Sequence, residues 1–386
     1  MDDGDRRAPA VRAAFIGSGF MGRMHARAAA ANGAELVAVL SRDPERADRA
    51  AAELGAARGR TSLEQLLAED RPDVVHICSP NATHHDYARA VIEAGVNVVC
   101  EKPLATSPAD AQDLADLADE RDVVASVPFV YRFHPMVREA RARIAAGELG
   151  RVIGLQGAYL QDWLLLPDDD DWRVDSRVGG PSRAFGDIGS HLVDLLEFVT
   201  GERIARLVAT TATVHARRGG RSVDTEDVAA VLVELAGGAV GTIQVSQVFA
   251  GHKNDLVLDV AGELASLRFE QERPDTLLLG GRDASAVLSR DARVLAADAA
   301  RLSTVPSGHP MGYADAFTGY VGDVYAAIRG ERPEGLPTFR DGARAAEATA
   351  AVLRSAAGRS WTDLPTRGID DDRDDATRHA LHRAVG

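Results

Sequence analysis

Residues 11–22 read VRAAFIGSGFMG and set the expectation for the N-terminal part of the chain. A short apolar run, typical of a buried strand, leads into a glycine-rich turn, and an alanine-rich helical stretch follows. In such a unit the first glycine makes the tight turn, the second admits a pyrophosphate, and the third lets the helix pack closely on the strand. The helix N-terminus offers N–H groups to the phosphates. The stretch therefore predicts a dinucleotide site, rather than a turn without a ligand, over Gly17, Ser18, Gly19, Phe20, Met21 and Gly22.

Beyond this unit, strand-like and helix-like stretches alternate as far as residue 130. Strands are predicted over ELVAVLS, DVVHICSP, VNVVCEKP and VVASVPF, with alanine-rich helices between them. This alternation is typical of βαβ units in a doubly wound parallel sheet. After residue 131 several strand-like runs follow one another across glycine turns, which predicts a mainly antiparallel sheet. We expect an α/β protein with a Rossmann domain over 10–130, a second α/β domain over 131–365 and a charged tail over 366–386.

Composition narrows the class of protein. The chain has 386 residues, which at roughly 150 residues per domain predicts two domains. A net charge of −14 disfavours nucleic acid as a partner, since a duplex-binding surface is normally basic. No apolar run approaches the roughly 18 residues of a membrane span. Two cysteines in apolar runs, Cys78 and Cys100, fit a reducing compartment, and we expect a cytoplasmic protein.

Lysine is rare in this chain. Lys and Arg together number 44, yet only Lys102 and Lys253 are lysines. The chain thus uses arginine for almost every positive charge. A lysine can titrate whereas an arginine stays charged, so a lysine in such a chain is a candidate for proton transfer. Lys102 directly follows a predicted parallel strand, and ligands of open α/β sheets bind beyond the carboxyl ends of the strands. We interpret Lys102 as a proton acceptor or donor; the alternative is a lysine that only pairs with a phosphate or carboxylate.

Asp187 and His191 form a second candidate pair. They are four residues apart in DIGSH, a spacing that places both side chains on one face of a helix. His191 is a titratable group at neutral pH. Asp187 alternatively caps the helix, and His191 alternatively is a core histidine. Two residues without an obvious third ligand make a metal site a weak hypothesis, and we predict none.

Aromatic and polar residues gather between residues 161 and 173. Trp163 and Trp172 occur there with Gln161 and Arg173, a combination that suits a sugar ring with apolar faces and a polar rim. The tryptophans alternatively belong to a core or an interface. The acidic run 168–171 lacks the alternate spacing of a calcium loop, and we interpret it as solvated surface.

The end of the second predicted strand bears on cofactor choice. An acidic residue there commonly binds the adenosine 2′-hydroxyl of NAD. This chain has Ser41 at that position, followed by Arg42, and both favour a 2′-phosphate. The acidic residue Asp43 comes two residues after the usual position. The sequence leaves NAD and NADP open.

Further motifs follow in order along the chain. They are Ser79-Pro80-Asn81 with His84, Glu101-Lys102-Pro103, Tyr131-Arg132-Phe133-His134-Pro135, and Asp187 with His191. Together with the glycine loop they resemble the Gfo/Idh/MocA family of sugar and cyclitol dehydrogenases, over about residues 11–365. The stretch from Gln161 through Trp163 to Trp172-Arg173, with Tyr131, looks most like the levoglucosan dehydrogenase branch.

The resemblance implies a fold and roles for named residues. The C-terminal domain would carry a large open sheet that packs against another subunit, giving a homo-dimer or homo-tetramer. Lys102 and His191 would share the proton transfer, and Asp187 would hold the reacting hydroxyl. Ser79 and Asn81 would line the nicotinamide ribose. The expected cofactor contacts are completed by Ser41, Arg42, His84, Glu101 and Lys102, and the expected substrate contacts are Tyr131, Gln161, Trp163, Trp172, Arg173, Asp187 and His191.

These observations predict an NAD(P)-dependent oxidoreductase. It would oxidise a secondary hydroxyl, C3 on the levoglucosan branch, of a pyranose-like sugar, anhydrosugar or cyclitol to the ketone. One alternative is a redox-neutral enzyme that retains its cofactor while it cleaves or epimerises a glycoside. Another is an NAD(P)-sensing regulatory protein, which would need the glycine loop but neither Lys102 nor His191.

Overall fold

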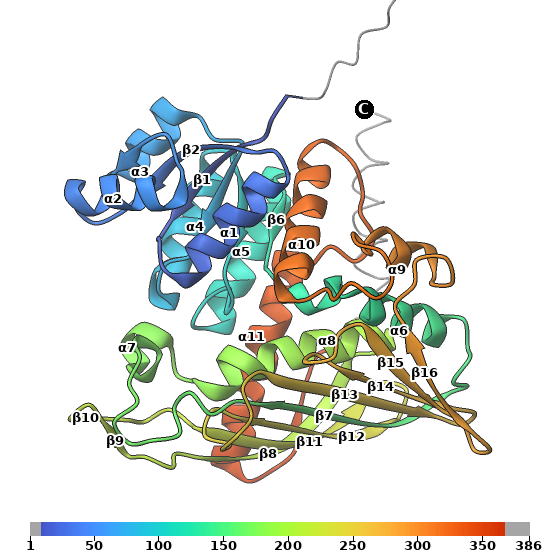
Figure 1. The fold of residues 1–386 in the computed structure, drawn as a ribbon. Helices are drawn as coiled ribbons and strands as arrows, with labels where there is room; N and C mark the ends of the chain where they lie inside the picture. Colours follow the sequence, from blue (N-terminus) through green and yellow to red (C-terminus); the bar gives the residue numbers. More distant parts are fainter. Residues whose placement is uncertain (1–8, 367–386) are drawn as a thin grey trace, which may run out of the picture. The chain divides into compact units, whose positions relative to one another are not determined.

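A computed structural model describes residues 9–366 (Figure 1). Contacts divide the chain into two compact units, each described here by itself. The first unit comprises the chain up to residue 105, residues 109–128 and residues 314–343. The second comprises residues 106–108, 129–313 and 344 onward. The predicted tail over 366–386 lies outside the described residues, apart from Thr366.

The first unit is built on a six-stranded parallel sheet. Its order, β3-β2-β1-β4-β5-β6, is that of a doubly wound nucleotide-binding sheet. Every residue of β4 is buried, as expected for a strand with helices on both faces. The predicted fold class is confirmed. The strands are β1 (Arg12–Ile16), β2 (Glu35–Leu40), β3 (Gly59–Arg60), β4 (Val74–Ile77), β5 (Asn97–Cys100) and β6 (Ala125–Ser126).

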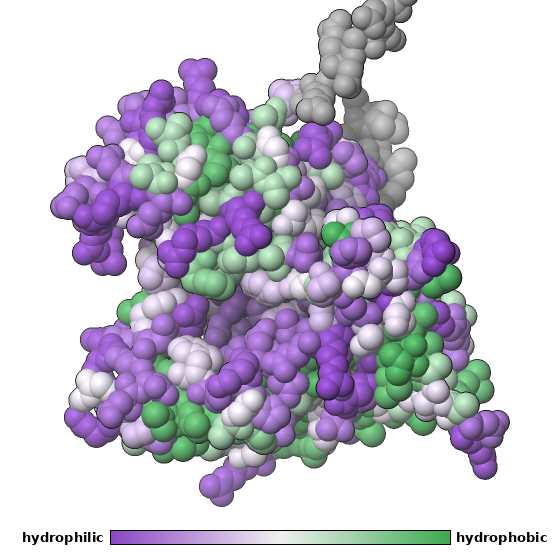
Figure 2. All heavy atoms as spheres, viewed as in Figure 1, coloured by the Kyte–Doolittle hydropathy of each residue, from purple (hydrophilic) through white to green (hydrophobic). Residues whose placement is uncertain are grey.

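Helices connect these strands in the order that the sequence predicts. They are α1 (Phe20–Ala31), α2 (Pro44–Leu54), the short α3 (Leu63–Gln65), α4 (His84–Glu93) and α5 (Pro108–Arg121). On α2 the alanines at positions 47 and 50 are buried, whereas Glu45, Arg46 and Arg49 are exposed, so the helix is amphipathic. Figure 2 shows the result: hydrophilic residues predominate on the surface over α2 and α3.

A late segment of the chain completes the core of the first unit. Helix α10 (Tyr313–Ile328) buries Phe317, Tyr320 and Tyr325. The hydroxyl of Tyr320 donates to Ser126 Oγ at 2.9 Å, and Ser126 in turn donates to the carbonyl of Pro337. The edge strand β6 is therefore tied to residues more than 190 positions away in the sequence.

The second unit is built on a nine-stranded mixed sheet. Its order is β16-β15-β14-β13-β7-β12-β11-β8-β17, and every neighbouring pair is antiparallel except β7 with β12. The predicted mainly antiparallel sheet is confirmed. The strands are β7 (Val152–Leu160), β8 (Ile204–Ala212), β11 (Val228–Leu235), β12 (Val240–Ser246), β13 (Asp255–Gly262), β14 (Ser266–Glu270), β15 (Thr276–Gly280), β16 (Ser285–Ser289) and β17 (Thr362–Asp363), and a separate hairpin pairs β9 (Arg217–Arg218) with β10 (Arg221–Ser222).

Within the described part of the chain, helices cover one face of the large sheet and leave apolar residues exposed on the other. Helices α6 (Pro135–Ala145), α8 (Ser190–Thr200) and the C-terminal part of α11 (Phe339–Gly358) contribute to one apolar core with the sheet (Figure 1). The alternation is clear on β11, where Val231 and Val233 are buried but Leu232 between them is 51% exposed. Val240 and Val287 are likewise exposed. Two further short helices are α7 (Ser176–Gly179) and α9 (Ala297–Arg301).

Within residues 9–366, no helix has both the length and the apolar character that crossing a membrane requires.

Candidate active site

The glycine loop has the geometry that a pyrophosphate site needs. Gly17 has φ +97°, and a Cβ there would lie 2.7 Å from the carbonyl oxygen of Cys78. A Cβ on Gly22 would collide with the Gly17 carbonyl. A Cβ on Gly19 would instead meet nothing within 4 Å, and Gly19 is the N-cap of α1, whose first turn has no acidic side chain. The loop thus leaves open space at a positive helix end, which fits a dinucleotide.

The acidic residue near the end of β2, Asp43, caps a helix. Asp43 is the N-cap of α2, and its Oδ1 accepts the backbone N–H of Arg46 at 2.9 Å. Ser41 is half-buried and Arg42 is exposed. Ser41 and Arg42 therefore remain the predicted contacts to the adenosine ribose or its phosphate.

His84 joins two of the predicted motifs. Its ring is fully buried, with Nε2 2.9 Å from the carbonyl of Ser79 and Nδ1 2.8 Å from the carbonyl of Pro103. Burial lowers the pKa of His84, although both carbonyls and Glu101 favour the charged ring. A neutral ring donates to one of these carbonyls only. His84 positions the two turns, and its ring nitrogens face the protein backbone.

Lys102 lies directly after β5. The backbone N–H of Glu101 donates to Ile77 O, which extends the pairing of β5 with β4 by one residue. Glu101 is buried: Oε2 accepts the Lys102 backbone N–H at 3.2 Å, and Oε1 lies 3.0 Å from His25 Nε2. Glu101 stays a predicted cofactor contact, and its partner His25 was not predicted.

In the second unit, Asp187 and His191 do not share one regular helix. Asp187 lies in a π-helical turn, Phe185–Gly189, and His191 lies in the first turn of α8. The N-cap of α8 is Gly189, so Asp187 does not cap it. Instead, Asp187 Oδ2 accepts from Gln247 Nε2 at 2.8 Å, and Oδ1 lies 3.6 Å from Arg173 Nε.

A buried polar network is hydrogen-bonded to Asp187 through Gln247, and no sequence motif predicted it. Gln247 Oε1 accepts from Arg183 Nη1 at 3.1 Å, and Arg183 is paired with Asp227. Arg218 also donates to Asp227, at 2.9 Å. Burial alone would raise the pKa of Asp227, but both guanidinium groups hold it below its usual value. Gln247 follows β12 and Asp227 precedes β11, so only strand pairing brings them together.

His191 packs against Tyr131. Their ring centroids are 5.1 Å apart in an edge-to-face arrangement, and the ring of Phe129 lies 5.7 Å from His191 on another side. Tyr131 lies in the 3₁₀ turn Val130–Phe133 and is 3% exposed. Burial raises the pKa of Tyr131, which keeps its hydroxyl protonated as a donor.

Three predicted substrate residues are linked through two residues that were not predicted, Tyr159 and Asn254. Tyr131 and Tyr159 share a hydrogen bond of 2.5 Å, and Tyr159 donates to Asn254 Oδ1 at 2.6 Å. The same oxygen accepts from Gln161 Nε2 at 2.9 Å, while Gln161 Oε1 accepts from the indole of Trp163 at 2.8 Å. Asn254 comes just before β13, which pairs with β7, so the sheet register explains a contact that no local motif shows.

Arg173 lies against Trp172 and between two carboxylates, those of Asp171 and Asp187. The guanidinium of Arg173 lies 4.3 Å from the centre of the Trp172 ring, and its Nη1 pairs with Asp171 at 3.1 Å. The neighbouring Asp170 pairs with Arg221. The acidic run thus makes ion pairs and caps, and Arg173 contacts both the Trp172 ring and the Asp187 carboxylate.

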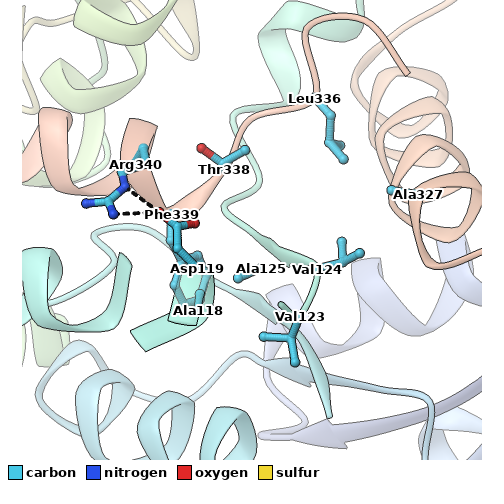
Figure 3. A pocket seen from close by; sticks show the side chains of 10 residues that line it. All are labelled: Ala118, Asp119, Val123, Val124, Ala125, Ala327, Leu336, Thr338, Phe339 and Arg340. Atoms are coloured by element: carbon cyan, nitrogen blue, oxygen red, sulfur yellow. Dashed lines mark hydrogen bonds and ion pairs between the residues drawn. The ribbon is translucent and has the colours of Figure 1, made fainter. Parts of the chain in front are cut away.

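Figure 3 shows a pocket of about 230 Å³ in the first unit. It is mainly apolar, with Val123, Val124 and Leu336 in its lining, and Arg340 at its rim pairs with Asp119. None of the predicted site residues lines it.

Comparison with known proteins gives the family. Residues 11–129 match the sequence model of the oxidoreductase family with an NAD-binding Rossmann fold, and residues 137–268 match the GFO/IDH/MocA C-terminal domain. The chain belongs to the Gfo/Idh/MocA family. It is thus an oxidoreductase with an NAD-binding domain, and the predicted family and cofactor class are confirmed.

Two relatives and one solved structure sharpen the comparison within Gfo/Idh/MocA. Levoglucosan dehydrogenase of Pseudarthrobacter phenanthrenivorans is 29% identical, with 91% of this chain and 97% of the relative covered. Inositol 2-dehydrogenase 2 of Saccharopolyspora erythraea is 30% identical over 65% and 71% of the two chains. The structure of a levoglucosan dehydrogenase in complex with NADH and levoglucosan has a TM-score of 0.87 at 28% identity, covering 93% and 100%. These relatives are dehydrogenases that act on CH–OH groups, which is the predicted enzyme class.

Proposed function

We propose that this protein oxidises one secondary hydroxyl of a pyranose-like sugar, anhydrosugar or cyclitol to a ketone, with NAD or NADP as oxidant. The observation that carries the proposal is the linked set of side chains in the second unit. His191 packs against Tyr131, burial and the charge of Asp187 raise the pKa of Tyr131, and the Gln161–Trp163 pair adds an aromatic face with an amide. Such a set suits a ring with polar edges and apolar faces.

Each reacting group has a role in this proposal. Asp187, held by Gln247, accepts a hydrogen bond from the reacting hydroxyl and fixes its orientation. Lys102 takes the hydroxyl proton as the carbon loses its hydride, and His191 shares the proton transfer. A bound nicotinamide cofactor would supply the acceptor for that hydride, and Gly19 with the N-terminus of α1 would hold its pyrophosphate.

We propose an anhydrosugar as the substrate. The resemblance to the levoglucosan dehydrogenase branch supplies C3 as the proposed position of oxidation. The relative with 91% coverage of this chain is a levoglucosan dehydrogenase, and a similar structure contains NADH and levoglucosan. An inositol dehydrogenase is also among the relatives, so a cyclitol is the second candidate substrate.

The test is a substrate panel read at the absorbance band of reduced nicotinamide. The purified protein receives NAD or NADP with levoglucosan, glucose, myo-inositol or a set of glycosides. A signal with levoglucosan, together with product oxidised at C3, supports the full proposal. A signal with myo-inositol alone moves the substrate to the cyclitols. Turnover of a glycoside without net NADH favours the redox-neutral alternative, and full turnover by Lys102→Ala contradicts the proposed proton acceptor.

Two further expectations stay predictions. We propose a cytoplasmic location on the strength of two reduced cysteines, Cys78 and Cys100. We also propose a homo-oligomer through the open face of the nine-stranded sheet, where Leu232, Val240 and Val287 are exposed. Light scattering of the purified protein and of Leu232→Glu tests the second expectation.

A further inference from the structure

Five side chains of the second unit form a single row of hydrogen bonds. The indole of Trp163 donates to Gln161 Oε1 at 2.8 Å, and Gln161 Nε2 donates to Asn254 Oδ1 at 2.9 Å. Tyr159 donates to the same oxygen at 2.6 Å, and its hydroxyl lies 2.5 Å from that of Tyr131. Asn254 Nδ2 donates to the Tyr131 hydroxyl at 3.3 Å. Asn254 thus contacts three of the other four members of the row.

The direction of every hydrogen bond in this row follows from the residue at its end. An indole N–H can only donate, so the oxygen of Gln161 must face Trp163 and its nitrogen must face Asn254. An amide nitrogen does not accept, so Asn254 must turn Oδ1 to Gln161 and Nδ2 to Tyr131. The single hydrogen of Tyr159 is used on Oδ1 of Asn254. Tyr131 is therefore the donor between the two hydroxyls.

This fixed direction limits what the row can offer to a ligand. Burial raises the pKa of Tyr131 and of Tyr159, so both hydroxyls keep their hydrogens. Tyr131 uses its hydrogen on Tyr159 and can only accept a further hydrogen bond. One Nε2 hydrogen of Gln161 goes to Asn254, and no acceptor within residues 9–366 takes the other. The row therefore offers an acceptor at Tyr131 and a donor at Gln161.

The backbone under both amides of the row is held by hydrogen bonds of its own. Asn254 comes immediately before β13, and its N–H donates to Glu272 Oε1 at 2.9 Å. The N–H of Gln161 donates to the carbonyl of Ser246, and its carbonyl accepts from the N–H of Phe249, both at 2.8 Å. The two amides therefore start from fixed backbone positions. What the row adds is the orientation of the side chains.

We propose that Asn254 is a positioning residue of the sugar site. It sets which hydrogen-bonding groups Gln161 and Tyr131 offer, and through Gln161 it orients the indole of Trp163. The inference rests on the proposed function. Trp163 is 37% exposed and its N–H is satisfied within the protein, so the indole is available to an apolar sugar face. The row fits a ring with a hydroxyl that donates to Tyr131 and an oxygen, hydroxyl or ether, that accepts from Gln161. Without Asn254 the amide of Gln161 is free to turn.

The first experiment measures kcat and KM for the sugar in Asn254→Leu, whose side chain is similar in size but neither donates nor accepts. We expect KM to rise about tenfold or more, the scale of one or two lost hydrogen bonds. We expect kcat to stay within about threefold, because the row binds the substrate and the transition state alike. A fall of kcat with an unchanged KM is what a purely structural defect gives, and it overturns the proposal.

Asn97→Leu is the matched control, because Asn97 also donates to a carbonyl and accepts a backbone N–H, at the start of β5 in the first unit. Its KM for the sugar should stay at the wild-type value.

A double variant tests whether Asn254 acts through the row. Trp163→Phe removes the N–H that sets the direction of the hydrogen bonds but keeps an aromatic ring. If Asn254 acts on Trp163 through Gln161, the double variant Asn254→Leu/Trp163→Phe should raise KM by less than the product of the two single effects. A KM equal to that product would mean that the two residues act separately, and it overturns the inference.

A third measurement needs no turnover. In the full chain labelled with ¹⁵N-tryptophan, the indole signal that disappears in Trp163→Phe identifies Trp163 among the three tryptophans. We expect this signal to shift in Asn254→Leu and to stay in place in Asn97→Leu. A signal that stays in place in both variants overturns the inference, whatever the substrate is. Silence of the wild type across the substrate panel would instead refute the proposed function, and the indole signal would still decide whether Asn254 orients Trp163.

Discussion

The two units build their halves of the chemistry in different ways. The first unit uses backbone: a glycine loop, a helix N-terminus and turns at strand ends, all within short stretches of sequence. The second unit uses side chains from several elements, joined by hydrogen bonds such as Gln247 to Asp187 and Gln161 to Asn254. The comparison teaches that a nucleotide site is largely a property of local chain geometry. A substrate site is a property of the register of a sheet.

The largest effect should come from Lys102, the residue of the first unit to which we assign proton transfer. We expect Lys102→Ala to lower kcat by roughly 10²- to 10⁴-fold, the usual contribution of a general base. Binding of NADH, followed by its fluorescence, should stay within a few-fold because the glycine loop is untouched. The matched control is Lys253→Ala, which removes the chain's other lysine, an exposed residue paired with Asp162. Equal activity of the two variants would contradict the assigned role.

The second prediction concerns the side-chain network of the second unit. Gln247→Leu removes the donor to Asp187 Oδ2 and leaves Arg183 without its amide partner. We expect kcat/KM for the sugar to fall by about 10- to 100-fold, as the cost of a lost buried hydrogen bond to a charged group. Cofactor binding should be unchanged.

Gln244→Leu is the matched control, because Gln244 is an exposed residue of the same region of β12. If Gln247→Leu weakened NADH binding as much as it lowers kcat/KM for the sugar, its effect would not be confined to the substrate-binding residues of the second unit. Unchanged kinetics of Gln247→Leu would show that Asp187 is positioned without this network.

The difference between local chain geometry and sheet register also determines how much the sequence could predict. The glycine loop, the parallel sheet and the place of Lys102 after β5 follow from contiguous patterns, and the structure has them where the sequence predicts. Asn254 and Gln247 lie in no local pattern, because their partners are set by the pairing of β13 with β7 and of β11 with β12. The return of α10 to the first unit is also invisible locally, since its burial depends on residues such as His25 and Ser126 far along the chain.

The third prediction compares the acid stability of the units. His76 and His84 are buried in the first unit with lowered pKa values. Below pH 6.5 the unfolded chain binds protons that these rings exclude, so the free energy of unfolding decreases as the pH falls. The slope is up to about 1.4 kcal/mol per pH unit for each ring. In the second unit the pKa of Asp227 is also lowered, but its stabilisation is lost only at more acidic pH, below the ordinary range of a carboxyl.

Urea unfolding at pH 7.5 and pH 5.5 checks this difference. Trp163, Trp172 and Trp361 all belong to the second unit, so tryptophan fluorescence reports on that unit, whereas far-ultraviolet circular dichroism reports on both. We expect acid to shift an early circular-dichroism transition more than the fluorescence transition. His76→Gln should reduce that shift. Transitions that move together would mean that the two units unfold as one.

The smallest effect is expected at the exposed end of β2, where the first unit depends on a side chain rather than on backbone. Arg42 is exposed, so its attraction to a 2′-phosphate is weakened by water and salt. We expect Arg42→Ala to lower the ratio of kcat/KM with NADP to that with NAD by about fivefold, the scale of one exposed ion pair. Arg49→Ala is the control, because Arg49 is an exposed arginine of α2 that pairs with Glu45. Raising the salt concentration should shrink the Arg42 effect and leave the Gln247 effect unchanged. A ratio that does not respond to Arg42→Ala would mean that backbone geometry alone sets cofactor choice.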